Sequence, residues 1–172
     1  MKIAICGKMC SGKTTLADYI ISKDERFKKD SVAAKLKEIA TDLFGMKSKD
    51  RNLLINVGKK MREIDVDVWL NYVCEKHKDN FIIIDDIRYR NELKKFKSEG
   101  FLLVRIIVSK ELQLERLQHT YSDNWVDHLR NVSDISETNL DDVPYSEFDL
   151  VLDTDKENVF NKMDEFLNLN KQ

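Results

Sequence analysis

One short run of residues carries the clearest chemistry in this sequence. Residues 7–14 read Gly-Lys-Met-Cys-Ser-Gly-Lys-Thr, a full match to the pattern G-x-x-x-x-G-K-[ST]. Glycines in such a loop let backbone N–H groups surround one phosphate, and the N-terminus of a following helix adds partial positive charge. The lysine can reach the β- and γ-phosphates, and the threonine hydroxyl can ligate Mg²⁺. The pattern therefore predicts an ATP-binding loop, with contacts from Gly7, Ser11, Gly12, Lys13, Thr14 and Thr15.

Two aspartates and an arginine follow the clearest strand signal in the chain, residues 81–84. Asp85 and Asp86 close this expected strand, and a carboxylate there can hold Mg²⁺ together with Thr14. We take Asp86 as the better candidate, the alternative being that both aspartates are solvated loop residues or cap a helix. Arg88 stands two residues past Asp86, and its planar guanidinium suits a phosphate near the transferred group. The alternative for Arg88 is a surface arginine in the first turn of a helix.

Other side chains could bind a phosphate acceptor or close over ATP. Trp69 could stack on a base, or it could belong to the core, which its helical spacing favours. Arg116 and Arg130 flank the polar segment 119–137, and mobile lids of phosphotransferases carry arginines that exclude water from ATP. Loop arginines are otherwise only solvated, so this alternative stays open. The chain has no Cys/His spacing that indicates a zinc site.

Hydrophobic periodicity indicates the elements that must position these residues. The alternation of strands and helices, together with the phosphate-binding loop, predicts a three-layer α/β/α P-loop NTPase fold with a parallel sheet. Gly45 and Gly100 are expected helix ends, whereas Gly58 falls inside a helix, where close approach of the backbone to a substrate would explain it. Residues 23–30 read as a charged loop and residues 119–147 as polar and acidic. The expected strands are 3–6, 81–84, 101–108 and 148–152, and the expected helices are about 13–21, 32–44, 50–62, 66–77, 89–98, one beginning near 112, and 156–169.

The composition narrows the class of protein. With 172 residues, 42% of them apolar, the chain can bury one core and reads as a single domain. Its 29 Lys+Arg and 31 Asp+Glu nearly cancel, so the basic footprint of a nucleic-acid-binding protein is absent. No apolar run approaches the ~20 residues of a membrane span, and the first residues lack the anatomy of a signal peptide. Three cysteines are too few for a disulfide framework, so we expect a reduced, cytoplasmic protein without nucleic-acid or membrane partners.

Two further strings are typical of GTPases, but their context argues against that class. Residues 42–45 read Asp-Leu-Phe-Gly, yet the residues before them have helical spacing rather than the spacing of a strand. Residues 161–164 read Asn-Lys-Met-Asp, inside the amphipathic period of the last expected helix rather than at a strand end. A GTPase-type switch therefore remains only a minor alternative.

With these features in place, the chain resembles the deoxynucleoside monophosphate kinases of tailed phages and large DNA viruses, within the nucleoside monophosphate kinase-like P-loop group. The resemblance covers nearly the whole chain. Its most discriminating part combines the Asp-Ile-Arg-Tyr block with the Gly-x-x-x-Arg and Asp-x-Trp block. The matching segments are 11–14 (Ser-Gly-Lys-Thr), 33–37 (Ala-Ala-Lys-Leu-Lys), 57–62 (Val-Gly-Lys-Lys-Met-Arg), 67–69 (Asp-Val-Trp), 86–89 (Asp-Ile-Arg-Tyr), 91–92 (Asn-Glu), 136–137 (Ser-Glu) and the strand 148–152.

The resemblance implies a nucleoside monophosphate kinase-like fold and transfer of the γ-phosphoryl group from ATP, with Mg²⁺, to a deoxynucleoside 5′-monophosphate. It implies one kinase domain over residues 1–172, with an acceptor-binding subregion at about 30–77 and a lid at about 117–137. A viral protein would act in the host cytoplasm, and a homodimer is left open. Another small-molecule kinase of the group, such as a phosphomevalonate or dephospho-coenzyme A kinase, is the alternative, and a catalytically dead nucleotide-binding protein is a further one. Carried over by position, Arg62, Trp69 and Arg88 resemble monophosphate-site residues, with Lys37 a possible further one, and Arg116 and Arg130 resemble lid arginines. We therefore expect the catalytic set to be Lys13, Asp86, Arg88, Arg116 and Arg130.

Overall fold

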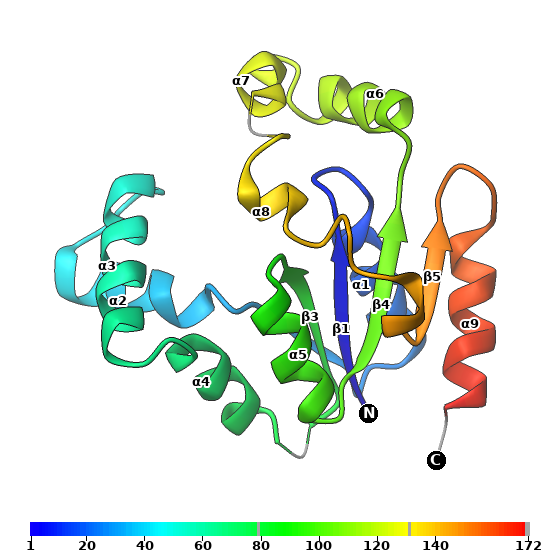
Figure 1. Ribbon diagram of the computed structural model, residues 1–172, viewed down its shortest axis with the longest axis horizontal. Coiled ribbons are helices and arrows are strands. Elements are labelled where there is room, and N and C mark those ends of the chain that lie inside the picture. The colour runs from blue at the N-terminus through cyan, green and yellow to red at the C-terminus, as the bar shows by residue number, and fades with distance from the viewer. Residues whose placement is uncertain (79, 131, 171–172) are drawn as a thin grey trace.

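Five parallel strands form the central sheet, in the order β2-β3-β1-β4-β5 (Figure 1). The computed structural model describes residues 1–78, 80–130 and 132–170. The chain builds one side of the sheet first and crosses to the other side of β1 only after β3, so the carboxyl ends of these strands frame the switch point at which α/β folds bind ligands. The strands are β1 (Lys2–Gly7), β2 (Lys28–Asp30), β3 (Ile82–Ile87), β4 (Leu102–Ile107) and β5 (Leu150–Asp153).

The helices connect these strands, and all but one of those described fall into three groups (Figure 1). Two of them, α1 (Lys13–Lys23) and α9 (Val159–Leu169), pack on one side of the sheet. The excursion between β2 and β3 holds α2 (Ala34–Phe44), α3 (Arg51–Ile64) and α4 (Val68–Lys76). After α5 (Arg90–Ser98) and β4, the helices α6 (Lys110–Thr120), α7 (Trp125–Leu129) and α8 (Ile135–Thr138) lie beyond the carboxyl ends of the strands, and a 3₁₀ turn, η1 (Tyr145–Glu147), precedes β5.

Alternate residues of the strands face two separate cores. Ile3 and Ile5 belong to a cluster with Leu16 of α1, whereas Ala4 between them lies in a second cluster with Phe96 of α5. Successive side chains of a strand point to opposite faces, and a parallel sheet covered on both faces needs apolar residues at nearly every position. The expected three-layer α/β/α P-loop fold is therefore confirmed.

The structure differs from the expected elements in three segments. Residues 23–30 were expected as a charged loop, but they include β2, which pairs Lys28–Asp30 with Ile82–Ile84 of β3. As an edge strand, β2 exposes two lysines and so carries no apolar signature. The strand expected at 81–84 extends to Ile87, so both aspartates lie within β3. The polar segment 119–147 is not one loop, because it contains α7, α8 and η1.

The two GTPase-like strings lie in helical structure. Residues 42–44 end α2, and Gly45 caps that helix with a left-handed φ of 66°. Residues 161–164 lie within α9, where Met163 is buried and Asp164 accepts a hydrogen bond from the Tyr19 hydroxyl. The context argument against a GTPase is thereby confirmed for both strings.

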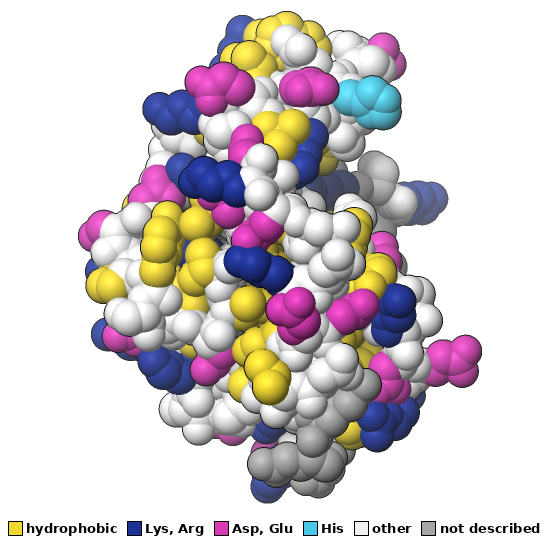
Figure 2. All heavy atoms as spheres, turned by 90° about the vertical axis from the view of Figure 1, so that its right-hand side faces the viewer, with side chains coloured by type: hydrophobic (Ala, Val, Ile, Leu, Met, Phe, Trp, Pro, Cys, Tyr) yellow, Lys and Arg dark blue, Asp and Glu magenta, His cyan; other side chains and the backbone are white. Residues whose placement is uncertain are grey.

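Charges of both signs are interspersed on the molecular face that Figure 2 shows, rather than gathered by sign. This mixture agrees with the formal net charge of −2. Among the residues with described positions, none of the helices combines the length and the apolar character of a membrane span. Cys6, Cys10 and Cys74 are free thiols.

Candidate active site

The P-loop, residues 7–14, turns sharply between β1 and α1. Gly7 permits this close turn, because a Cβ there would lie 2.6 Å from Ser11 Oγ and 2.7 Å from the Ile106 carbonyl oxygen. Cys10 and Gly12 take left-handed φ values of 59° and 100°, and Gly12 is the N-cap of α1. A loop of this shape, followed at once by a helix N-terminus, turns successive N–H groups toward one anion position.

The Lys13 ammonium is folded back over the P-loop. Its Nζ donates to the carbonyl oxygens of Gly7 and Lys8, each at 2.7 Å. Burial, together with the nearby Arg88 guanidinium, lowers the pKa of Lys13 to about 8. The charged form of a lysine held in this way is destabilised. A bound phosphate would stabilise that charged form, since it supplies a nearby negative charge.

Thr14 lies against Asp85 rather than Asp86. The Thr14 hydroxyl donates to Asp85 Oδ2 at 2.8 Å. Asp86, which the sequence favoured as the metal carboxylate, points the other way and accepts hydrogen bonds from the N–H groups of Val32 and Ala33 at 3.0 and 3.5 Å. Burial raises the pKa of Asp86. The geometry therefore favours Asp85 as the carboxylate beside Thr14, and places Asp86 at the start of the excursion between β2 and β3.

The oxygens of Thr14 and Asp85 fit Mg²⁺, which prefers oxygen ligands and keeps several waters when it binds with phosphates. No group of three or more His, Cys, Asp or Glu side chains is arranged as a metal cage in residues 1–78, 80–130 and 132–170. A Mg²⁺ ion here would accordingly take its remaining ligands from nucleotide phosphates and water.

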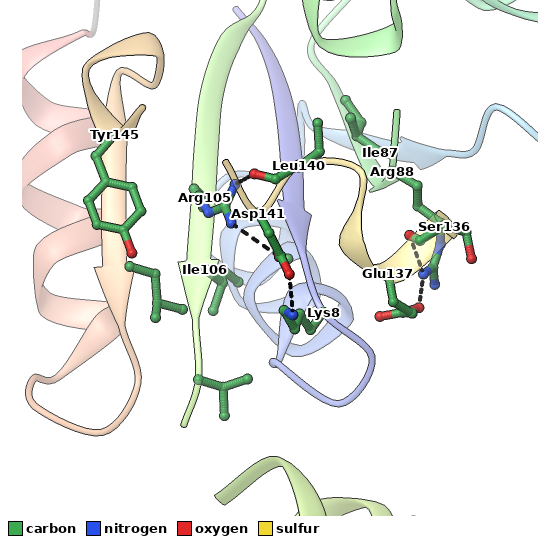
Figure 3. Close-up of a pocket in the computed structure, with 13 residues that line it drawn as sticks. Lys8, Ile87, Arg88, Arg105, Ile106, Ser136, Glu137, Leu140, Asp141 and Tyr145 are labelled. Carbon is green, nitrogen blue, oxygen red and sulfur yellow. Dashed lines mark hydrogen bonds and ion pairs between the residues drawn. The ribbon is translucent and has the colours of Figure 1, made fainter. Parts of the chain in front are cut away.

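Arg88 lies at the carboxyl end of β3 and meets a residue that the sequence analysis did not assign to the site. Its guanidinium pairs with the carboxylate of Glu137 and donates to the Ser136 carbonyl oxygen at 3.3 Å (Figure 3). The other Glu137 oxygen accepts the N–H of Met9 at 2.6 Å. The only sequence signal for Glu137 was its place in the Ser-Glu pair of the family resemblance.

A pocket of about 240 Å³ opens beside these contacts, between the P-loop, β4 and the segment after α8 (Figure 3). Within it, the Lys8 ammonium pairs with Asp141 at 2.8 Å. Arg105 reaches from β4 to donate to the Leu140 carbonyl oxygen at 2.7 Å. The segment after α8 is thus fastened to both the P-loop and the sheet.

A larger pocket, about 740 Å³, lies on the opposite flank of the P-loop and is wide enough for a nucleoside. Arg116 of α6 lines it and donates to the Cys10 and Ser11 carbonyl oxygens at 3.3 and 3.2 Å, and to Thr154 Oγ1 at 3.4 Å. Arg116 therefore lies on the outer side of the P-loop rather than at Arg88. Of the lining residues, sequence reasoning identified the P-loop members, Thr15 and Arg116 but missed Tyr121, Thr154, Asn158 and Phe160.

Lys37 of α2 and Arg62 of α3 lie in the excursion between β2 and β3. In the described part of the chain, neither side chain makes a hydrogen bond or an ion pair. Gly58 is explained by this neighbourhood, because a Cβ there would lie 3.3 Å from Arg62 Nη1 and 3.4 Å from Leu36 Cδ2. The small residue makes room for the guanidinium and for the packing of α2 on α3, whereas we had expected close approach to a substrate.

Two further residues that the sequence suggested for the active site, Trp69 and Arg130, do not line either of the two pockets beside the P-loop. Trp69 is only 4% exposed and belongs to the core that covers β3, so the core alternative describes it and no ring face is open to a base. Arg130 extends into solvent with its side chain 76% exposed and pairs with Asp127 of α7 at 3.0 Å. Nothing in the described structure brings Arg130 to the P-loop, and residue 131 of the expected lid lies outside the described residues.

A family model described as an AAA domain matches residues 3–136, well over half of the chain. The chain belongs to this AAA-domain family. The match runs from β1 of this AAA-domain protein to the second residue of α8, so it includes the P-loop, both aspartates, Arg88 and Arg116, and it ends one residue before Glu137. A comparison with curated proteins finds no match.

Solved structures similar to this AAA-domain protein include small-molecule kinases. Shikimate kinase from Bacteroides thetaiotaomicron superposes with a TM-score of 0.61 at 14% identity, over 98% of each chain. Shikimate kinase from Acinetobacter baumannii gives 0.58 at 14% identity, over 98% of this chain and 91% of that one. A gluconokinase from Sinorhizobium meliloti gives 0.56 at 14% identity, over 99% and 97%. At these identities the likeness shows the fold, an α/β P-loop kinase fold.

Proposed function

We propose that the protein is a kinase that transfers the γ-phosphoryl group of ATP to a deoxynucleoside 5′-monophosphate, giving ADP and the diphosphate. The observation that carries the proposal is the convergence of Lys13, the Thr14–Asp85 pair and Arg88 at one edge of the sheet, beside a pocket that can hold a nucleoside. Kinase acceptors named in the similar structures, shikimate and gluconate, support the broader class. The family resemblance supports the nucleotide acceptor.

The proposed roles follow from charge and position. Lys13 and Arg88 neutralise the transferring phosphoryl group, and Thr14 with Asp85 holds Mg²⁺, directly or through water. Mg²⁺ held by these two residues would supply positive charge next to the nucleotide phosphates. An acceptor phosphate has a second pKa of about 6 and is ionised near neutral pH, so no side chain has to remove a proton from it. The chain's main contribution is therefore positioning and electrostatic stabilisation.

The acceptor phosphate is assigned to Lys37 and Arg62, whose side chains make no short ion pair in the described structure, although Lys37 lies in the field of Asp86 and Arg62 in that of Glu92. We place the acceptor-binding subregion at about 30–77 and the lid at about 117–137, within a single kinase domain over residues 1–172. Arg116 belongs in this scheme to the nucleotide pocket, and Arg130 would have to move with α7 to reach ATP.

An acceptor panel tests the proposal. We expect ATP-dependent release of ADP with at least one deoxynucleoside monophosphate, at a rate well above that of ATP alone, because the acceptor completes the site. The panel contains all common nucleoside and deoxynucleoside monophosphates together with shikimate, gluconate, phosphomevalonate and dephospho-coenzyme A. Turnover confined to the non-nucleotide acceptors would overturn the nucleotide assignment, and acceptor-independent GTP hydrolysis would indicate a switch protein.

Replacing Arg62 by alanine should raise the acceptor KM about tenfold or more while the ATP KM changes less than threefold. A charged hydrogen bond to a phosphate contributes about 1.5–3 kcal/mol, and Arg62 does not line the nucleotide pocket. Lys60→Ala is the matched control, since Lys60 lies on the same helix but pairs with Glu63 at 2.8 Å. Steady-state kinetics with each substrate varied in turn measure both constants. An equal rise of the two KM values in Arg62→Ala would remove Arg62 from the acceptor site.

A further inference from the structure

Glu137 is a buried carboxylate that bridges two parts of the phosphate site. Its side chain is 2% exposed, and its two oxygens take different partners. One accepts the Met9 N–H of the P-loop at 2.6 Å. The other pairs with the Arg88 guanidinium, as Figure 3 shows. The segment that follows it is held in place by two ion pairs, Lys8 with Asp141 and Arg90 with Asp142.

Both partners belong to the parts of the site that we assign to phosphate. Met9 lies inside the P-loop, where backbone N–H groups cradle phosphate oxygens. Arg88 is the guanidinium assigned above to the transferring group. An N–H has one hydrogen, and a carboxylate oxygen at 2.6 Å occupies it, so a phosphate oxygen cannot share that donor at full strength.

The same carboxylate also acts on the charge of Lys13. The charge of Glu137 is among those that raise the pKa of Lys13 and partly offset its burial. The carboxylate thus lies in the field of the lysine, the guanidinium and the loop N–H together. A phosphoryl group that entered this position would meet an anion of the protein, and two like charges at such a position repel each other.

We propose that Glu137 is an internal anion that holds the P-loop and Arg88 in the nucleotide-free protein, and that bound ATP displaces it. The inference rests on the nucleotide-binding part of the proposed function. Displacement breaks the contact that fastens α8 to the P-loop, and α8 lies at the carboxyl-terminal end of the expected lid. Binding of ATP is thereby coupled to release of the lid's carboxyl-terminal end.

The test measures the Kd for Mg-ATP without any acceptor, by calorimetric titration. Glu137→Gln keeps the size of the side chain but removes its charge, and we expect its Kd to fall about tenfold because the competing anion is gone. Asp142→Asn is the matched control: it removes the same charge from the same segment and loses the pair with Arg90, but it does not touch the P-loop. Its Kd should stay within twofold of that of the wild type.

A purely structural role for Glu137 predicts the opposite sign, namely weaker ATP binding. An unchanged or higher Kd in Glu137→Gln, or an equal fall in Asp142→Asn, would overturn the proposal.

Thermal unfolding adds a second readout: the Tm of nucleotide-free Glu137→Gln should fall, whereas the rise in Tm on adding Mg-ATP should exceed that of the wild type. If Glu137→Gln fails to fold, Glu137→Asp replaces it: the shorter side chain keeps the charge but cannot reach both partners at once, so its Kd should fall by less than tenfold.

This experiment is separate from the acceptor panel. A panel without turnover would overturn the proposed kinase reaction and leave the ATP affinities of these variants as measured. Conversely, unaltered ATP affinity in Glu137→Gln would refute the proposed displacement of Glu137 and would leave the conclusion from the acceptor panel unaffected.

Discussion

Lys13→Ala should lower the rate of ATP turnover by about 10²–10³-fold without loss of the fold. The Lys13 ammonium is folded over the P-loop carbonyls, and under the proposed function its removal takes away a cation that would neutralise the transferring phosphoryl group. The substitution should not destabilise the protein. The pKa of Lys13 is about 8 in the folded chain against 10.5 ordinarily, so folding disfavours its charged form. A coupled ADP-release assay and the Tm near pH 7 measure the two effects, and full activity in the variant would refute the mechanism.

The same lowered pKa gives the Lys13 prediction a pH dependence. Between about pH 8 and 10.5 the unfolded chain binds more protons at this residue than the folded chain, so this group's contribution to stability rises with pH in that window. Affinity for ATP should change in the other direction, weakening as pH rises through about 8, because a neutral amine attracts phosphate less. Lys13→Arg is the control, since its guanidinium stays charged and should show no inflection there. Identical pH profiles for the two proteins would assign the dependence to another group.

Local sequence patterns were sufficient to predict much of the fold and the P-loop part of the site. The P-loop could be predicted in full because its residues are neighbours in sequence and the required torsions depend on their own types. The apolar strands and amphipathic helices follow from periodicities of the same local kind. The edge strand β2 could not be predicted in this way, since its pairing with β3 depends on backbone hydrogen bonds that polar side chains do not reveal.

Contacts between distant segments explain what the sequence could not show. Glu137 meets Met9 across 128 positions, and no spacing rule connects them. Trp69 fits a helical period in either role, and only the packing of α4 on the sheet decides that it is buried. Arg130 and Arg116 both flank the polar segment, yet α6 brings Arg116 onto the P-loop whereas Arg130 stays on exposed α7.

The choice between Asp85 and Asp86 is a question of strand parity. Ile83 lies in the core that contains α1, and Ile84 lies in the opposite core. Asp85 lies on the side of Ile83 and meets Thr14 at the start of α1, while Asp86 lies on the side of Ile84 and meets Val32. The alternation is broken just beyond, because the pairing of β3 with β1 shifts register after Ile84, and Ile87 lies in the same core as Ile84. The sequence contains the alternation but not the face on which α1 packs.

This parity predicts different losses for the two aspartates. Asp85→Asn should lower kcat by about 100-fold and raise the Mg²⁺ concentration needed for half-maximal activity, because a carboxylate that orients a metal ligand typically contributes 10–100-fold. Its Tm should change little, since Asp85 lies at the open edge of the P-loop. Asp86→Asn should lower the Tm, because an amide cannot accept from both the Val32 and Ala33 N–H groups as the carboxylate does.

Magnesium titration of kcat, combined with thermal unfolding, separates the two roles within one pair of neighbouring variants. The substitutions are chemically identical and one residue apart, so general effects of charge removal should be similar in both. A shift of the Mg²⁺ half-saturation confined to Asp85→Asn would follow from the hydroxyl contact with Thr14. The reverse result, a shift confined to Asp86→Asn, would make Asp86 the metal carboxylate and would require the end of β3 to rotate when nucleotide binds.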